Sequence, residues 1–250
     1  MSEAIKFPKT PRLTEVMRED VPAEWRDAHA IVEEKVDGAN VGLWIDTADL
    51  GVLRLQSRGH ILRGGAGEEQ FSALHRWAAE RLDVLRETLT DRYVLYGEWC
   101  FAKHRAFYDA LPDWFLGIDV LDRTSGKFLG AMERNRIMAV CRVRPVVHLW
   151  SGRFMRAPAF GSFLGPSRYK TDKWRDALST EAALRGNIHF VREVWRETDD
   201  SNDAEGVYVR VELDGYVVGR MKAHRPGFEK VRSDTWNEHA IVRNRVIPLV

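Results

Sequence analysis

Apolar and polar residues alternate, or form short apolar runs, in several segments that predict β-strands. These segments cover residues 29–35, 40–46, 52–58, 91–97, 114–121, 208–211 and 216–221. The last two flank Asp214-Gly215, a dipeptide typical of a hairpin turn. Helices are predicted over residues 13–19, 68–89 and 131–142. In the longest of them, six large apolar side chains fall near one stripe: Phe71, Leu74, Trp77, Leu82, Leu85 and Leu89.

The order of these elements predicts an α+β fold built on antiparallel sheets, because strands and helices mix without βαβ regularity and Asp-Gly turns recur. The sequence contains no internal repeat, low-complexity tract or Pro/Ser-rich linker. Residues 1–250 are therefore expected to form a single domain. The last informative segment ends at Lys222, which leaves little chain for a separate OB-fold or other C-terminal domain.

Composition narrows the class of protein. Hydrophobic residues make up 44% of the chain, enough for a proper core, and the formal charge is only +1. Nucleic-acid binding would therefore need a local basic patch. The two cysteines, Cys100 and Cys141, form no CxxC pair, so we expect no zinc site or disulfide framework and a cytoplasmic location. With no signal peptide and no run of ~18 apolar residues, no membrane partner is expected.

A lysine stands where the first predicted strand meets a turn, in Glu34-Lys35-Val36-Asp37-Gly38. Asp37-Gly38 predicts a tight turn between two strands, with Lys35 on its rim. An exposed amine, with a pKa near ~10.4, is a poor nucleophile unless burial, neighbouring cations or a metal lower that pKa. Arg220 and Lys222 are cations that could do so if their strand lies alongside. For this short pattern alone, a surface lysine beside a hairpin is the alternative.

Two acidic residues and one basic segment carry further chemistry. Glu98 ends a predicted strand, and Glu205 precedes Gly206 at the start of another, where an acid can approach phosphates and Mg²⁺ with few steric limits. Residues 220–232 contain five Lys/Arg against one Glu, a local charge of +4, and alternation places Arg220 and Lys222 on one face of a strand. Such cations suit phosphoryl or nucleotidyl transfer. Solvated acids and a charged strand edge are the alternatives.

Taken in order, these segments resemble the motifs of the covalent nucleotidyltransferase superfamily, which contains ATP-dependent DNA ligases, RNA ligases and mRNA-capping guanylyltransferases. The matching segments are Lys35-Val36-Asp37-Gly38, Ser57-Arg58-Gly59, Tyr96-Gly97-Glu98-Trp99, Phe115-Leu116-Gly117-Ile118-Asp119-Val120, Ala204-Glu205-Gly206-Val207-Tyr208-Val209-Arg210 and Arg220-Met221-Lys222. The chain is most similar to the RNA ligase 2 group, on Glu34-Lys35-Val36-Asp37-Gly38-Ala39-Asn40 and on Tyr96-Gly97-Glu98-Trp99 followed by Ala102-Lys103-His104.

The resemblance implies a three-step reaction that uses ATP and Mg²⁺ (or Mn²⁺). Lys35 attacks the α-phosphate of ATP, releases pyrophosphate and becomes lysyl-AMP. The AMP then passes to the 5′-phosphate of an RNA end, and a 3′-hydroxyl attacks that activated end. The implied partners are RNA ends or nicked duplex RNA, with a protein partner for end engagement as an open alternative.

The resemblance also implies roles for the other residues. Asp37 and Gly38 belong to the nucleotide-binding segment of the nucleophile. The remaining roles are Glu34 beside the adenine, Arg58 on a substrate phosphate or the nucleotide, Glu98 on the ribose, Glu205 on the metal, and Lys222 with Arg220 on the α-phosphate.

Three positions depart from the family pattern. Arg220 stands where a lysine is usual, and its planar fork differs from a lysine's point charge. Ile118 stands where an aromatic residue often stacks on adenine, so either Ile118 makes an apolar contact or Phe115 provides the stack. Asp37 replaces a histidine of the RNA ligase 2 group.

Two alternatives to an RNA ligase remain open. One is an enzyme with the same first step and another acceptor, such as a DNA ligase or a guanylyltransferase. The other is a non-catalytic protein that binds RNA ends.

Overall fold

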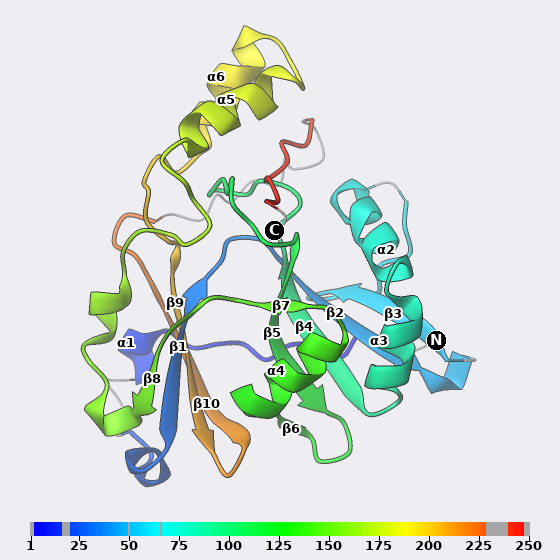
Figure 1. Ribbon diagram of the computed structural model, residues 1–250, viewed down its shortest axis with the longest axis vertical. Coiled ribbons are helices and arrows are strands. Elements are labelled where there is room, and N and C mark those ends of the chain that lie inside the picture. Colours follow the sequence, from blue (N-terminus) through cyan, green and yellow to red (C-terminus); the bar gives the residue numbers. More distant parts are fainter. Residues whose placement is uncertain (1–2, 17–20, 50, 66, 229–239, 248–250) are drawn as a thin grey trace.

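The protein is described by a computed structural model covering residues 3–16, 21–49, 51–65, 67–228 and 240–247. Its strands form two antiparallel sheets that face each other (Figure 1). The four-stranded sheet has the order β10-β9-β1-β8, with β10 (Tyr216–His224), β9 (Gly206–Leu213), β1 (His29–Lys35) and β8 (His148–Arg153). The structure is therefore mixed α and β on antiparallel sheets, as the sequence predicts.

The six-stranded sheet has the order β3-β2-β4-β5-β6. Its strands are β3 (Val52–Ser57), β2 (Ala39–Asp46), β4 (Tyr93–Trp99), β5 (Phe115–Asp122) and β6 (Lys127–Phe128), and the short β7 (Arg144–Pro145) pairs with β5 in parallel. All other pairings in this sheet are antiparallel. The predicted hairpin at Asp214-Gly215 is present and joins β9 to β10.

The turn at Asp37-Gly38 does not make a hairpin, so that prediction was wrong. β1 pairs with β8 and β9, whereas β2 pairs with β3 and β4, and the chain crosses between the two sheets at this point. Gly38 is required by a close approach, because a Cβ there would lie 2.8 Å from the Trp99 carbonyl oxygen. Lys35 therefore stands where the two sheets meet.

Helices cover the outer face of the six-stranded sheet. The predicted helix over 68–89 is interrupted, with a 3-10 turn η3 (Glu69–Phe71), then α2 (Ser72–Ala79) and α3 (Leu82–Leu89). The break falls at Arg81, whose guanidinium lies over the Trp77 ring at 4.3 Å and pairs with Asp113. Both helices bury most of the predicted stripe against the sheet, with Leu74 and Leu85 fully buried, but Leu82 of that stripe is exposed. Helix α4 (Ala131–Val140) matches its prediction to within two residues.

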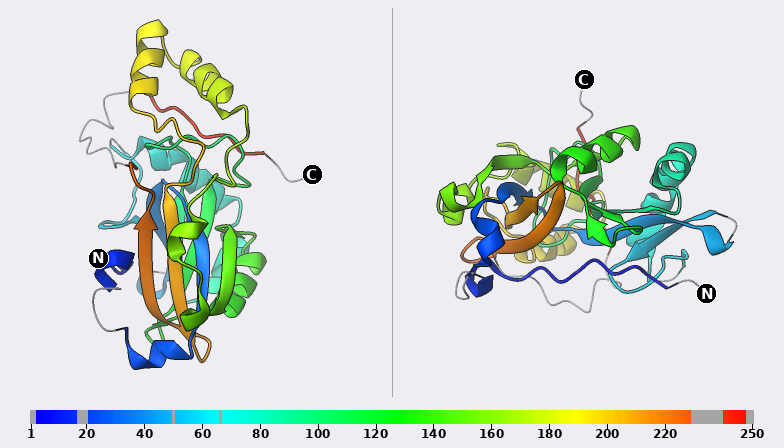
Figure 2. Two further views of the ribbon diagram at one scale, coloured as in Figure 1. Left: turned by 90° about the vertical axis from the view of Figure 1, so that its left-hand side faces the viewer. Right: turned by 90° about the horizontal axis from the view of Figure 1, so that it is seen from below.

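The sequence pattern predicts no element between residues 143 and 198, where the structure has β7, β8 and two helices. Helices α5 (Trp174–Ala183) and α6 (Ile188–Arg196) form a hairpin that projects from one end of the molecule (Figures 1 and 2). Trp174 and Leu178 of α5 are fully buried in a separate small core with Val194 of α6. Of the predicted N-terminal helix, α1 (Leu13–Val16) is seen, and residues 17–19 lie outside the described residues.

The smaller helical turns are η1 (Ala23–Arg26), η2 (Thr47–Asp49), η4 (Phe154–Arg156) and η5 (Phe160–Phe163). They lie at the ends of strands, and two of them, η1 and η4, pack together through Trp25 and Phe154, whose ring centroids are 5.5 Å apart. This contact helps to close the outer face of the four-stranded sheet.

Buried ion pairs join the two sheets. Arg210 of β9 is fully buried and pairs with Asp119 of β5, which is also fully buried. Arg134 of α4 pairs with Glu33 of β1, with 2.6 Å between Nη2 and Oε1. Both arginines donate hydrogen bonds to the Ile118 carbonyl, at 2.7 Å from Arg134 and 3.0 Å from Arg210. This polar layer fixes the position of Ile118 between the sheets.

Candidate active site

A cavity of about 760 Å³ lies where the two sheets meet. Its walls come from β1, the crossover after it, β2, the end of β3, β4, β5, β10 and the N-terminal segment. Seven of the eleven residues predicted for the site line it: Glu34, Lys35, Gly38, Arg58, Glu98, Ile118 and Lys222. Residues that are far apart in sequence are thus brought to one cavity.

Lys35 is the last residue of β1, and its amine is held by Glu205. The Lys35 Nζ atom lies 2.8 Å from Glu205 Oε2, and the Glu205 side chain is fully buried. The register explains this contact, because Lys35 pairs with Gly206, the residue after Glu205. On the other side of the same carboxylate, His224 Nε2 lies 3.3 Å from Oε1.

The charge around Lys35 differs from the expectation that Arg220 and Lys222 lower its pKa. Burial lowers the pKa of Lys35, but the charges of Glu205, Glu98 and Asp37 and the hydrogen bond to Glu205 outweigh that effect. The net result is a pKa raised above the ordinary lysine value. In the protein alone, Lys35 is therefore protonated at neutral pH and is not yet a nucleophile.

Glu34 forms part of the cavity wall beside Lys35. Its carboxylate accepts hydrogen bonds from Ser167 Oγ at 2.5 Å and from the Arg168 amide at 2.9 Å. Burial raises the pKa of Glu34, and these two hydrogen bonds oppose the rise. The segment 167–168 thus orients Glu34, a contact with no signal in the sequence pattern.

Asp37 has a structural position. Its carboxylate accepts the amide N–H groups of Arg105 and Ala106, at 2.7 and 2.9 Å, and its own amide donates to the Tyr108 hydroxyl at 2.9 Å. It is 5% exposed and does not line the cavity. Direct nucleotide contact by Asp37 is therefore not what the structure shows, because its oxygens are directed to the 105–106 backbone.

The two candidates for the base contact are separated by the structure. Ile118 lines the cavity. Phe115 is fully buried in the core on the helix-covered side of the sheet, with its ring centroid 4.8 Å from that of Trp77. The alternative in which Phe115 stacks on the base was wrong, since its ring faces the core, and contact of Ile118 with a base stays a prediction.

The two basic residues of β10 occupy different surroundings. Lys222 lines the cavity, and its backbone amide donates to the Pro11 carbonyl at 3.0 Å. Arg220 is not part of the lining: its Nε lies 3.1 Å from Asp119 Oδ2 and its guanidinium lies 3.9 Å from the Phe128 ring centroid. Arg220 helps to neutralise the buried Asp119, and a phosphate contact by Arg220 stays a prediction. Residues 229–232 of the basic segment lie outside the described residues.

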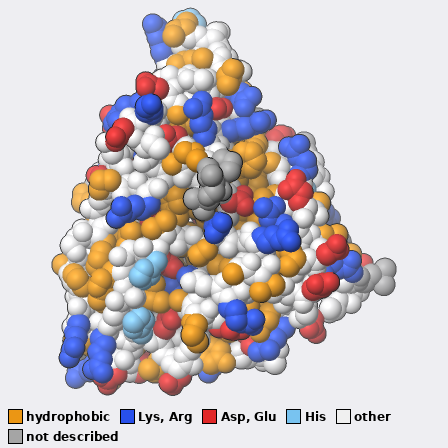
Figure 3. All heavy atoms as spheres, in the orientation of Figure 1, with side chains coloured by type: hydrophobic (Ala, Val, Ile, Leu, Met, Phe, Trp, Pro, Cys, Tyr) orange, Lys and Arg blue, Asp and Glu red, His pale blue; other side chains and the backbone are white. Residues whose placement is uncertain are grey.

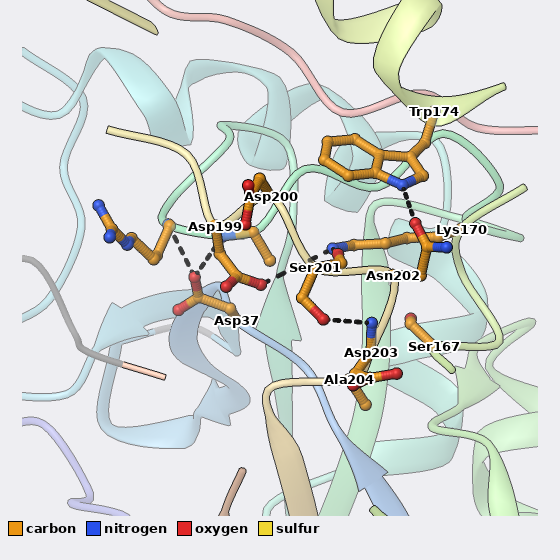
Figure 4. Close-up of polar contacts among 12 residues, drawn as sticks. Asp37, Ser167, Lys170, Trp174, Asp199, Asp200, Ser201, Asn202, Asp203 and Ala204 are labelled. Atoms are coloured by element: carbon orange, nitrogen blue, oxygen red, sulfur yellow. Dashed lines mark hydrogen bonds and ion pairs between the residues drawn. The ribbon is translucent and has the colours of Figure 1, made fainter. Parts of the chain in front are cut away.

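The loop that leads into Glu205 is fixed by polar contacts (Figure 4). Lys170 Nζ donates to the Ser201 carbonyl at 2.7 Å and lies 4.0 Å from Asp199 Oδ2. The Trp174 indole donates to Asn202 Oδ1 at 2.8 Å. The loop predicted at 199–203 is therefore present. It is held by Lys170 and Trp174, which lie in the region around α5 where the sequence pattern predicts no element.

The N-terminal segment is the largest part of the site that sequence reasoning missed. Lys6, Phe7, Pro8, Lys9 and Thr10 line the cavity, as do Asn40 and Tyr208. The segment crosses behind the strands in Figure 1 and lies opposite α4 in the right-hand view of Figure 2. It has no periodic pattern, and two isolated lysines carry little signal.

Among the described residues, no broad basic area appears on the face opposite this segment. Figure 3 shows that face, with Lys and Arg side chains interspersed with Asp and Glu. This distribution agrees with the formal charge of +1. Within the described residues, no helix is long and apolar enough to cross a membrane.

A family model for RNA ligases matches residues 28–224, and the chain belongs to the RNA ligase family. No curated protein matches the sequence significantly.

The fold is similar to that of solved structures of an RNA ligase from Naegleria gruberi. A substituted form with ATP and Mn matches with a TM-score of 0.53 and 16% identity, over 89% of this chain and 56% of that one. A structure with PPi matches with a TM-score of 0.51 and 16% identity, over 88% and 56%. The chain therefore spans little more than half of the length of these ligases, and at such identity the likeness concerns the fold.

Proposed function

We propose that this chain is a nucleotidyltransferase domain that works as an ATP-dependent RNA ligase, joining 5′-phosphate and 3′-hydroxyl RNA ends. The observation that carries the proposal is the position of Lys35: its amine is at the wall of a cavity that also holds Glu34, Glu98, Ile118 and Lys222. Family membership supports RNA as the substrate, and the Naegleria structures with ATP and Mn support these ligands.

In the first step, the neutral Lys35 amine attacks the α-phosphorus of ATP. A nitrogen–phosphorus bond forms, the bond from the α-phosphorus to the bridging oxygen breaks, pyrophosphate leaves with the bonding pair, and the attacking nitrogen releases one proton to solvent. Before the attack, Lys35 must lose a proton, and the acceptor in hydrogen-bond contact is Glu205 Oε2 at 2.8 Å. Lys222 is a cation on the same cavity wall and would stabilise charge on the α-phosphate.

In the second step, an oxygen of the RNA 5′-phosphate attacks the same phosphorus, and the Lys35 nitrogen leaves with the bonding pair and takes up a proton from solvent to become the neutral amine. In the third step, the RNA 3′-hydroxyl attacks the activated 5′-phosphate and AMP leaves with the bonding pair, while the hydroxyl proton passes to solvent. Arg58 is exposed at the cavity and makes no hydrogen bond or ion pair with the described residues, so it can receive an RNA phosphate.

The residues present fit Mg²⁺ or Mn²⁺. Glu205 and Glu98 both act on Lys35 by charge and offer the carboxylate oxygens that hard cations prefer. Within the described ranges, no three His, Cys, Asp or Glu side chains form a ready metal cluster. This suits Mg²⁺, which is often bound by one or two carboxylates with substrate phosphates and water. A bound divalent cation would supply charge that disfavours the protonated form of Lys35.

The test is intact mass of the purified protein before and after incubation with ATP and Mg²⁺. We expect the wild type to gain one adenylyl group and Lys35→Ala to gain none, with Lys173→Ala as a matched control on an exposed lysine outside the cavity. A gain by Lys35→Ala would show that another residue is the nucleophile. A gain with GTP alone would favour a guanylyltransferase.

Acceptor preference is tested with nicked duplexes built from RNA or DNA strands. We propose that nicked duplex RNA is sealed, in an RNA-repair role, with help from a protein partner where ends must be engaged. Preference for an all-DNA nick would contradict the RNA assignment. We also propose a cytoplasmic location, supported by two free, buried cysteines, Cys100 and Cys141.

A further inference from the structure

The N-terminal strap, residues 5–12, is fixed to the six-stranded sheet by buried polar groups. The Ile5 amide donates to Gln56 Oε1 at 2.9 Å, and the Ile5 carbonyl accepts from Gln56 Nε2 and the Tyr96 hydroxyl, both at 2.7 Å. Gln56 is 1% exposed and Tyr96 is fully buried. Hydrogen bonds from buried side chains fix the path of the strap at this end.

The other end of the strap is fixed to the four-stranded sheet. The Lys222 amide donates to the Pro11 carbonyl at 3.0 Å, and Arg12 forms a bridge with Lys222. Between the anchors, Phe7 packs on Tyr96 and Phe128, with ring centroids 5.1 and 5.7 Å away. The strap therefore joins both sheets across the cavity, and the right-hand view of Figure 2 shows it crossing.

The strap adds two cations to the cavity. Lys6 and Lys9 are exposed, line the cavity, and form no ion pair with the described residues. By contrast, Lys35 is paired with Glu205, and the Glu34 carboxylate is occupied by Ser167 and the Arg168 amide. Lys6 and Lys9 therefore join Arg58 as exposed cations of the cavity, and the strap contributes two of these three.

Apolar and basic residues both contribute to the cavity lining. Ile118, Val36 and Val146 contribute apolar surface near Glu34. Lys6 follows Ile5, whose amide is bonded to Gln56, and Gln56 is close in the chain to Arg58. Lys9 lies two residues before Pro11, whose carbonyl accepts the hydrogen bond of the Lys222 amide. A nucleotide with its base on the apolar side would direct its phosphates towards the strap.

We propose that Lys6 and Lys9 bind the β- and γ-phosphates of ATP, the part that leaves as pyrophosphate. The inference rests on the proposed function. In-line attack by Lys35 places the leaving group on the side of the α-phosphorus that faces away from the lysine. Because Lys222 is the α-phosphate cation and is bonded to the strap, the strap is the next source of charge beyond it. Lys6 and Lys9 then serve only the step that consumes ATP.

The test separates that step from sealing. The double variant Lys6→Ala/Lys9→Ala, the charge-conserving Lys6→Arg/Lys9→Arg, and Lys173→Ala as an exposed control are compared on two substrates. The first is ATP, with formation of lysyl-AMP measured. The second is a synthetic 5′-adenylylated RNA with a 3′-hydroxyl acceptor, which is sealed without ATP. Formation of ATP from preformed lysyl-AMP protein and added pyrophosphate measures the reverse of the first step.

We expect the double alanine variant to lose about tenfold or more in kcat/KM for ATP and a similar factor in the pyrophosphate reaction. Sealing of the adenylylated RNA stays within about twofold of wild type, and the double arginine variant recovers most of the loss. Lys173→Ala behaves as wild type in every assay.

Two results overturn the inference while leaving the proposed function intact. Unchanged use of ATP by the double alanine variant would show that the lysines do not bind the leaving phosphates. Equal loss on ATP and on adenylylated RNA would assign them to the RNA. If wild type itself forms no lysyl-AMP, the proposed function fails and this inference fails with it.

Discussion

The buried pair between Arg210 and Asp119 leads to a sharp prediction about stability. Both side chains are fully buried, and the Arg210 guanidinium also donates to the carbonyls of Ile118 and Leu129, at 3.0 and 2.8 Å. Substituting Arg210→Met keeps an unbranched apolar stem but removes every one of these donors. It leaves Asp119 buried with Arg220 as its remaining cation, 3.1 Å away.

The magnitude follows from burial. Removing one partner of a buried ion pair costs about 3–5 kcal/mol, because the other charge stays desolvated. Since Arg220 still faces Asp119 and Arg134 still donates to the Ile118 carbonyl, we expect the lower end, about 3 kcal/mol. A loss of this size is a large part of the stability of an ordinary domain.

A matched exposed pair serves as the control. Arg136 and Glu133 form two hydrogen bonds of 2.8 and 2.6 Å, yet their side chains are 64% and 39% exposed. Surface pairs of this kind contribute about 0–1 kcal/mol, so Arg136→Met is expected to change stability by less than about 1 kcal/mol. Arg136 holds its partner through two hydrogen bonds, so a larger effect at Arg210 would come from burial and from the carbonyl bonds that Arg210 makes.

The assay is urea unfolding at neutral pH, followed by tryptophan fluorescence, with the slope compared among the variants. We expect Arg210→Met to lower the midpoint strongly at an unchanged slope. The reasoning is refuted if Arg210→Met is no more destabilising than Arg136→Met. Since Ile118 lines the cavity, folded Arg210→Met protein is also expected to show a higher KM for ATP in the adenylylation assay.

Three further predictions concern the site and its supports. Glu205→Gln is expected to lower the pKa of Lys35, because it removes the charge that raises that pKa most. It is nevertheless expected to reduce adenylylation by about a hundredfold or more, through loss of both a metal ligand and the acceptor of the Lys35 proton; normal adenylylation of this variant at saturating Mg²⁺ would contradict both roles. Gly206→Ala would place a Cβ 2.0 Å from a backbone carbonyl oxygen, so we expect the free energy of unfolding in urea to fall by about 2 kcal/mol or more. Gly161→Ala lies in open space and is expected to change this free energy little; equal effects of the two variants would refute the steric argument. Burial lowers the pKa of Lys170 to about 8 from 10.5. The unfolded chain therefore binds more protons between those pH values, and the free energy of unfolding rises with pH across that window. Lys170→Met is expected to flatten this rise in urea unfolding midpoints from pH 7.5 to 10.5, and an unchanged slope would contradict the lowered pKa.

The hydrophobic pattern and the turn dipeptides predicted strands and turns that depend on neighbouring residues in the sequence. A short apolar run placed β1 correctly, and Asp214-Gly215 placed the turn of the β9–β10 hairpin. Asp37-Gly38 has the same signal and no hairpin, because what decides its path is distant: amides at 105–106 bind the Asp37 carboxylate. Turn chemistry shows where the chain bends and not which strand it meets afterwards.

The candidate site likewise contains residues that sequence motifs predicted and residues that they did not. Ordered motifs identified Lys35, Glu98, Ile118 and Lys222, which the structure brings to one cavity. Phe115 failed as a base contact because strand alternation and a bulge in the β4–β5 pairing decide which side it faces, and it faces the core. The strap lysines have no motif, since their position depends on the hydrogen bonds of Ile5 to a buried glutamine.

The raised pKa of Lys35 links the charge of the site to the order of binding. Glu205 and Glu98 favour a protonated, unreactive amine as long as their charge is not offset. The same two carboxylates offer the oxygens that hard cations prefer, so a divalent cation that arrives with ATP and binds them would cancel the interaction that keeps the proton on Lys35. The nucleophile would then be released only when nucleotide and metal are both present. The activation should therefore show as a fall in the pKa of the adenylylation rate as Mg²⁺ rises, and a pKa that does not depend on Mg²⁺ would separate the metal from the deprotonation of Lys35.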